Sequence, residues 1–358
     1  MSTASEVERL YAKGKRRKVL VILYASIALL IITVISVSLG AGSPRFMEAA
    51  QIILSRIFPF LEINPGSKIT QIIILDIRLP RVVLAIIAGA GLAASGATMQ
   101  GVLRNPLVSP YILGISAAAG FGAALAIVFR MGVLGAYSGY LVVVNAFMFS
   151  LLALSMVLSI ARMRGITPET VILAGVAVSY LFSAMLSLIQ YVAPEYDALR
   201  AVVFWLMGQL YVARWEDILI ILPMVLAAIA LMMRHSWDMN VMSLGEETAM
   251  SLGVNSRRVL VTCMALGAFA TASIISFTGA IGFIGLVSPH IARMSIGSDH
   301  RFLLPCSIVL GACLLLCSDT LARLVLMPSE IPVGIITSLI GAPFFLYFLL
   351  SRRRRFWH

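Results

Sequence analysis

The chain has 358 residues, of which 60% are apolar and 12% are charged, and its mean hydropathy is +1.00. This composition is typical of an integral membrane protein and excludes a large aqueous domain, such as a nucleotide-binding fold of about 100 residues. The sequence also lacks a G-x-x-x-x-G-K-[ST] phosphate-binding loop, so we expect any ATP to be hydrolysed by another chain. The basic residues behind the net charge of +11 lie at the edges of apolar runs and at the two ends, which indicates membrane topology and not nucleic-acid binding.

Ten apolar runs are long enough to cross a bilayer, because a spanning helix needs about 20 apolar residues. They predict an all-α polytopic membrane protein with about ten transmembrane helices in a single domain over residues 1–358. Two shorter stretches that carry charges, 47–60 and 199–212, are expected to lie in the membrane interface. The ten runs are 19–39, 82–103, 111–129, 137–160, 170–193, 216–233, 259–277, 280–296, 302–326 and 333–350.

The distribution of basic residues predicts which side of the membrane each loop faces. An even number of spans places both termini on one side, and the basic segments 13–18 and 352–355 predict that this side is the cytoplasm. With this topology, 18 of the 27 Lys and Arg residues fall on the cytoplasmic side. Residues 1–18 are therefore predicted to form a basic cytoplasmic tail.

The longest polar segment between two spans on the cytoplasmic side is 234–258. Two carboxylates at its centre suit the first turn of a helix, because the positive end of the helix dipole stabilises negative charge there. A following glycine suits the end of the helix. Three apolar residues can fall on one side of this turn, so a short amphipathic helix is predicted. It could be a handle for a partner protein or a plain connection between spans, and periodicity leaves both open. The residues concerned are Leu244, Ala249 and Leu252, with Glu246, Glu247 and Gly253.

On the opposite face, Arg78 and Arg81 lie at the mouth of the second span, and Arg323 lies near the end of the ninth. Guanidinium groups bind carboxylates bidentately, so these residues could form a cluster that receives acidic groups. The alternatives are that their charged ends reach the membrane surface individually, or that Asp319 and Glu330 simply pair with Arg323.

Few ionisable residues lie deep within the spans, which argues against a proton or sodium relay. His290 follows a proline in an apolar run, but a lone histidine without a second ligand is more often structural, so we predict no metal site. The tetrapeptide LVSP occurs at 107–110 and at 286–289, on opposite faces according to the topology above. An inverted repeat would produce this pattern.

Five segments together resemble the FecCD-type permease subunits of type II ATP-binding-cassette (ABC) importers, the iron-siderophore, haem and cobalamin family. They occur in the family's order and span roughly residues 70–350. The segments are RLPRVVLAIIAGAGLAASGATMQGVLRNPLVSPYILGIS (78–116), LGEETAMSLGV (244–254), GAIGFIGLVSPHIARM (279–294), DHRFLLP (299–305) and EIPVGIITSLIGAPFFLYFL (330–349).

The resemblance implies the ABC type II importer permease fold and a particular assembly. The family forms homodimers with the transport path between the subunits, joined by two ATPase subunits and one extracytoplasmic substrate-binding protein. No cofactor is then bound by this chain, and ATP and Mg belong to the partner ATPase. The VSPH segment recurs in family members of different substrate, which implies a structural role for His290.

The resemblance also implies roles for individual residues. The segment 244–253 matches the family's cytoplasmic coupling helices, which seat in a cleft of the ATPase. The external arginines match positions that face acidic residues on the two lobes of the binding protein. The implied coupling residues are Leu244, Gly245, Glu246, Glu247, Ala249, Leu252 and Gly253, and the implied docking residues are Arg78, Arg81 and Arg323.

The predicted function is therefore that of a permease subunit, not an enzyme, which imports a metal chelate (ferric siderophore, haem or cobalamin) across the inner membrane of a prokaryote. The fifth and tenth spans are expected to line the path, with Gln190 and Thr337 as polar exceptions. Two alternatives come from other classes, namely a stand-alone secondary transporter driven by an ion gradient and a structural membrane scaffold.

Overall fold

The computed structural model describes residues 2–40, 46–57, 67–131 and 140–351. Within these residues each of the ten predicted apolar runs forms a helix. Seven shorter elements lie between them: α2 (Phe46–Ile57), α3 (Lys68–Ile72), the π-helical η2 (Ile73–Arg78), the 3-10 turn η3 (Pro110–Leu113), α8 (Tyr196–Leu206), α10 (Ser236–Met242) and α11 (Glu246–Ser251). The ten helices are α1 (Ser2–Ser38), α4 (Leu79–Val102), α5 (Ile115–Phe129), α6 (Leu141–Arg164), α7 (Pro168–Val192), α9 (Trp215–Arg234), α12 (Ser256–Thr278), α13 (Ile284–Ile296), α14 (His300–Leu324) and α15 (Val333–Ser351).

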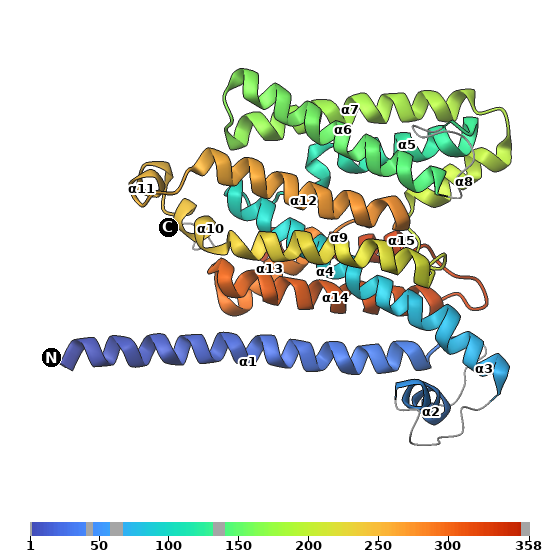
Figure 1. Cartoon of the computed structure of the whole chain (residues 1–358), viewed down its shortest axis with the longest axis horizontal. Coiled ribbons are helices and arrows are strands. Elements are labelled where there is room, and N and C mark those ends of the chain that lie inside the picture. The colour runs from blue at the N-terminus through green and yellow to red at the C-terminus, as the bar shows by residue number, and fades with distance from the viewer. Residues whose placement is uncertain (1, 41–45, 58–66, 132–139, 352–358) are drawn as a thin grey trace.

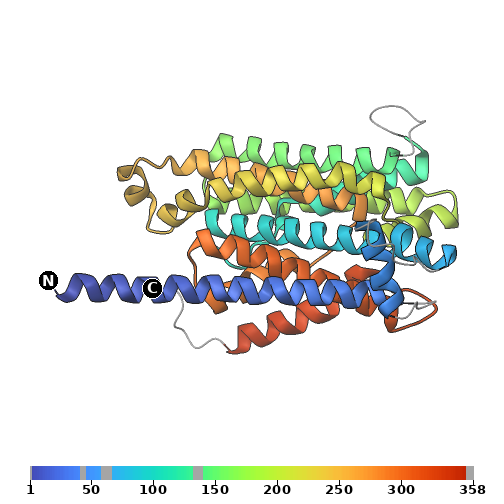
Figure 2. The same cartoon turned by 60° about the horizontal axis from the view of Figure 1, so that its bottom comes forward.

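The helices run along the long axis of one bundle (Figures 1 and 2). Among the described residues, six helices are long and apolar enough to cross a membrane, namely α1 over residues 12–38, α6, α7, α9, α12 and α14. The apolar helices α5 and α15 are shorter. The prediction of an all-helical, multi-pass membrane protein is confirmed, with fewer full-length spans than the ten runs suggested.

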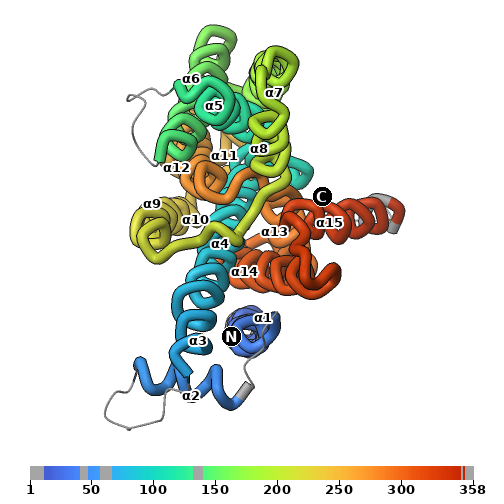
Figure 3. The backbone as a smooth tube through the Cα atoms, turned by 90° about the vertical axis from the view of Figure 1, so that its right-hand side faces the viewer, coloured from blue at the N-terminus to red at the C-terminus, as the bar shows by residue number. Residues whose placement is uncertain are grey.

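Helix α4 lies at the centre of the bundle, between α12, α13 and α14 (Figure 3). Twenty of its 24 side chains are buried, and they include many Gly and Ala residues. A Cβ added at Gly89 would overlap the backbone of Gly311 in α14, and one added at Gly96 would overlap the carbonyl oxygen of Gly285 in α13. These positions let the backbones touch, which is how helices associate where lipid gives no hydrophobic drive.

The first helix packs on the edge of the bundle, mainly against α14 (Figure 1). It is continuous through the basic segment 13–18, so this part of the predicted tail extends the first spanning helix. Helix α2 lies across the bundle axis at the opposite end (Figure 3). This orientation agrees with the interfacial helix predicted for 47–60.

The two LVSP segments do not lie on opposite faces, which corrects the topology predicted for them. The side-chain amide of Gln100 is 3.2 Å from the carbonyl oxygen of Val108 and 3.5 Å from that of Gly285. The Pro110 ring also lies 3.1 Å from the position of a Cβ added at Gly285. The reason is that the chain turns back inside the bundle after α12. Helix α13 has only 13 residues, or about 20 Å, and does not cross a whole bilayer.

The close contact of α4 and α13 predicts that Gly96→Ala destabilises the protein by about 1–3 kcal/mol, because the added methyl group forces the two backbones apart. Thermal unfolding in detergent measures the effect. The matched control is Gly14→Ala, since Gly14 is exposed on α1 with nothing within 4 Å of the added Cβ. There the same substitution should leave the unfolding temperature unchanged or raise it. Equal behaviour of the two variants would contradict the packing argument.

Candidate functional site

The segment 234–258 forms two short helices, α10 and α11, between α9 and α12. Both side views of the bundle place them at the end where α1 begins (Figures 1 and 2). They therefore lie on the same side as the basic segment 13–18, as the sequence predicted. The second helix was predicted from its charges and glycine, whereas α10 was missed.

Helix α11 begins and ends where the sequence indicated. Gly245 precedes it with φ +114° and Gly253 follows it with φ +80°, conformations that side chains with a Cβ rarely adopt. The backbone N–H of Ala249 donates to the carbonyl of Gly245 at 3.0 Å, and that of Val254 donates to the carbonyl of Ala249 at 2.9 Å. Glu246 lies in the exposed first turn, where its carboxylate favours the helix dipole.

The predicted single apolar side of α11 is wrong. Ala249 is fully buried, whereas Leu244 and Leu252 are 64% and 60% exposed. These two leucines lie just outside the helix, so the helical repeat does not apply to them. Met250 is also 60% exposed. The segment thus presents three apolar side chains and two carboxylates, Glu246 among them, on one short projection at the end of the bundle.

A hydrogen-bond cluster ties α10 to the beginning of α14. The Asn240 side-chain amide donates to the Asp299 carboxylate at 2.7 Å, and its oxygen accepts the backbone N–H of His300 at 2.8 Å. Arg301 donates to the Asp299 carboxylate at 2.8 and 3.0 Å, and its guanidinium lies 5.2 Å from the Trp237 ring centroid. The hydrogen bond from Arg301 lowers the pKa of Asp299 to about 2, so this acceptor is ionised near neutral pH.

Sequence reasoning did not assign this cluster, although DHRFLLP was among the segments that carried the resemblance. The polar pair at its start, Asp299 and His300, was the available signal. Asn240 could not be found from local pattern, because its partners lie about 60 residues away. This cluster holds α10 on the bundle, and because α10 directly precedes α11, it also restricts the position of α11.

We expect Asn240→Ala to loosen α10, because it leaves Asp299 and the His300 N–H without this partner at a cost of about 1–3 kcal/mol. Amide hydrogen exchange over residues 236–242 should become faster, while exchange in the centre of α14 stays slow. Ser251→Ala is the control, since the Ser251 hydroxyl is exposed and donates only within α11. Unchanged exchange in the Asn240 variant would show that the cluster does not hold α10.

At the opposite end of the bundle, three arginines and two carboxylates form what we call the external ion cluster: Arg78, Arg81, Asp319, Arg323 and Glu330. The Arg81 Nε lies 2.8 Å from an Asp319 oxygen, and its Nη1 lies 2.6 Å from Glu330 Oε2. The Arg323 Nε lies 3.2 Å from the other Asp319 oxygen. Asp319 thus pairs with both Arg81 and Arg323, and Glu330 pairs with Arg81.

Two of these arginines also bind the carbonyl end of α1. Arg78 donates to the carbonyls of Val37 and Ser38 at 2.9 and 3.1 Å. Arg323 donates to the Ser36 carbonyl and to the Leu39 carbonyl, both at 3.1 Å. The last carbonyls of a helix lack partners within it and attract positive charge, so these contacts attach α1 to the end of η2 and to α14.

The predicted docking arginines are therefore brought together, and they already bind groups of this chain. Arg78, Arg81 and Arg323 are only 5%, 6% and 6% exposed. Their role toward a binding protein stays a prediction. The alternative pairing within the chain is present, although Glu330 contacts Arg81 and not the predicted Arg323.

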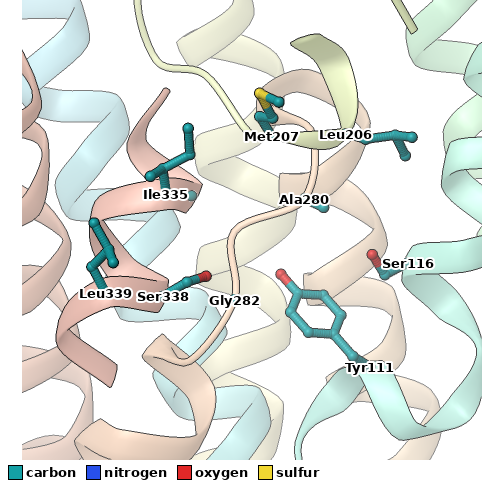
Figure 4. Close-up of a pocket in the computed structure, with 10 residues that line it drawn as sticks. Tyr111, Ser116, Leu206, Met207, Ala280, Gly282, Ile335, Ser338 and Leu339 are labelled. Atoms are coloured by element: carbon teal, nitrogen blue, oxygen red, sulfur yellow. The ribbon is translucent and has the colours of Figure 1, made fainter. Parts of the chain in front are cut away.

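A cavity of about 580 Å³ opens between α8, α15, the η3–α5 junction and the loop 280–282 (Figure 4). The Tyr111 hydroxyl donates to the Ile281 carbonyl and accepts its N–H at 3.1 Å, which fixes this loop. Of the two predicted polar path residues, Thr337 is buried and bonds within α15, and Gln190 does not line this cavity. The lining residues are Tyr111, Ser116, Leu206, Met207, Ala280, Gly282, Gly334, Ile335, Ser338 and Leu339.

Comparison with known proteins decides the family. Residues 28–351 match the model of the FecCD transport family. The chain belongs to the FecCD transport family. The cobalamin import system permease protein BtuC of Halobacterium salinarum is 39% identical over 340 residues, which cover 92% of this chain and 89% of that protein. The molybdate import system permease protein MolB of Haemophilus influenzae is 38% identical, over 90% of this chain and 94% of that protein.

The fold of this FecCD protein is also that of a solved transporter. A structure described as an inward-facing conformation of a metal-chelate type ABC transporter has a TM-score of 0.81 and 33% sequence identity, and covers 92% of this chain and 99% of that one. The family and fold predicted from the motifs are confirmed. This FecCD protein is the membrane permease subunit of an ABC importer.

Proposed function

We propose that this FecCD permease is a homodimer that imports a metal chelate, a ferric siderophore, haem or cobalamin, through the cytoplasmic membrane of a prokaryote. A substrate-binding protein delivers the chelate, and two ATPase subunits bind ATP and Mg. This chain binds no cofactor. The observation that carries the proposal is the exposed α11 projection on the side of the basic segment 13–18, in a chain of this family.

The shape of α11 supports the coupling role. The exposed Leu244, Met250 and Leu252 give it apolar area to bury in a cleft of a partner, and the carboxylates of Glu246 and Glu247 give it charge to orient there. Nucleotide-driven closure of the ATPases would displace α11 and α10. Because Asn240 bonds Asp299, α14 would move with them as part of a rigid body.

The cavity supports a chelate over a bare oxyanion as cargo. None of its ten lining residues is charged. A small oxyanion such as molybdate needs fixed donors or positive charge. The lining offers only the hydroxyls of Ser116, Ser338 and Tyr111, and that of Tyr111 is already engaged by Ile281. A large chelate, whose charge is enclosed by an organic ligand, can pass such a surface on weak contacts.

Reconstitution of this chain in vesicles with the ATPase and binding protein of its system tests the proposed function. Uptake of ferric siderophore, haem, cobalamin and molybdate is measured with ATP inside or outside the vesicles. We expect ATP-dependent uptake of one chelate and none of molybdate. Uptake that follows an imposed ion gradient without the ATPase would identify a secondary transporter. If the vesicles show neither uptake nor stimulated ATP hydrolysis, the result would favour a scaffold.

Charge reversal on α11 tests the coupling role. The double variant Glu246→Lys with Glu247→Lys should lower ATPase association at least about tenfold, which corresponds to about 1.4 kcal/mol, and should lower uptake with it. The control reverses two exposed acids at the other end, Glu195→Lys with Glu216→Lys, which also lie at helix beginnings and change the net charge equally. Normal association and uptake in the α11 variant would remove this segment from the ATPase interface.

A further inference from the structure

Glu330 is the exposed member of the external ion cluster. Its side chain is 41% exposed, whereas those of Arg81 and Asp319 are 7% and 0% exposed. It lies in the connection between α14 and α15, and its carboxylate oxygen is 2.6 Å from Arg81 Nη1. A second carboxylate that reached Arg81 Nη1 would therefore compete with Glu330 for the same N–H donor.

The other contacts in the cluster hold the bundle together and are not free to exchange. Asp319 is fully buried between Arg81 and Arg323, and removing it would leave buried guanidinium groups without their partner. Arg78 and Arg323 donate hydrogen bonds to the carbonyl end of α1. The Glu330 contact differs, because solvent competes for an ion pair with an exposed partner and Arg81 keeps Asp319 when Glu330 leaves.

The charges of the cluster favour a carboxylate in place of Glu330. Three arginines and two carboxylates leave a formal charge of +1, which rises to +2 when Glu330 moves away. An acidic group of the partner that takes the place of Glu330 therefore returns the formal charge of the cluster to +1. The vacated contact has the same chemistry, an Arg81 N–H donating to a carboxylate oxygen.

We propose that docking of the substrate-binding protein is a carboxylate exchange at Arg81, in which an acidic residue of the binding protein displaces Glu330. Glu330 is then an internal competitor that weakens docking and prevents the arginine from binding other anions. This inference rests on the proposed function, in which a binding protein docks at this end through acidic residues.

Because the arginines are buried and paired within this chain, substituting them is a poor test of docking. Arg81→Glu would place a third carboxylate beside Asp319 and Glu330 in a buried site, so the variant would lose its fold before docking could be measured. Glu330→Gln avoids this problem, because the amide keeps the size of the side chain and an acceptor for Arg81 while removing the charge.

The experiment measures binding of the substrate-binding protein to the permease–ATPase complex in nanodiscs, with Glu330→Gln and the control Glu195→Gln. Glu195 is an exposed acid directly before α8, outside the cluster. We expect Glu330→Gln to bind at least about threefold more tightly at low salt, with faster association and a steeper loss of affinity as salt is added. The control should bind like the unchanged chain.

Affinity in Glu330→Gln that equals the control, or falls below it, would overturn the exchange. The proposed function would survive that result, because the unchanged chain would still bind its partner and import the chelate. Absence of any binding by the unchanged complex would instead overturn the proposed function and the exchange with it. Thermal unfolding of both variants should match that of the unchanged chain, so a gain in affinity cannot come from a change in folding.

Discussion

The structure depends on backbone contact between α4 and its neighbours. Gly89 meets Gly311 of α14, and Gly96 meets Gly285 of α13, with no room for a methyl group at either crossing. In a membrane the association of helices gains little from burying apolar area, so close packing and satisfied polar groups must supply it. Because α4 is fixed in this way, the charged clusters at its two ends are held at defined positions.

Helix α14 connects the two regions that we assign to partners. Its beginning carries Asp299 and His300, which bind Asn240 of α10, and its last turns carry Asp319 and Arg323 of the external ion cluster. A helix of 25 residues is about 38 Å long, which exceeds the thickness of the hydrocarbon core. A rotation or translation of α14 would therefore move α10 and the external ion cluster together, although the two regions make no contact with each other.

The sequence predicts the positions and order of the ten apolar helices well, because hydropathy over about 20 residues is a strong signal. It also places Gly253 at the end of α11, where a positive φ favours glycine over residues with a Cβ. It failed where a contact is long-range or where the chain leaves a regular repeat. The Arg81–Asp319 pair spans 238 positions, and the return of the chain before α13 brought two LVSP segments together that a full crossing would have separated.

Family membership fixes the fold and the transport class more firmly than the cargo. Chains of nearly equal identity to this one are named for cobalamin and for molybdate, so overall similarity does not identify the cargo. The motif residues that the structure explains support this view, since Gly96, Gly285 and Asp299 all act in packing or helix attachment. The cavity lining carries no charged residue that would select one substrate over another. Selection of the chelate therefore belongs mainly to the binding protein, and the exchange at Arg81 is the step at which that choice reaches this chain.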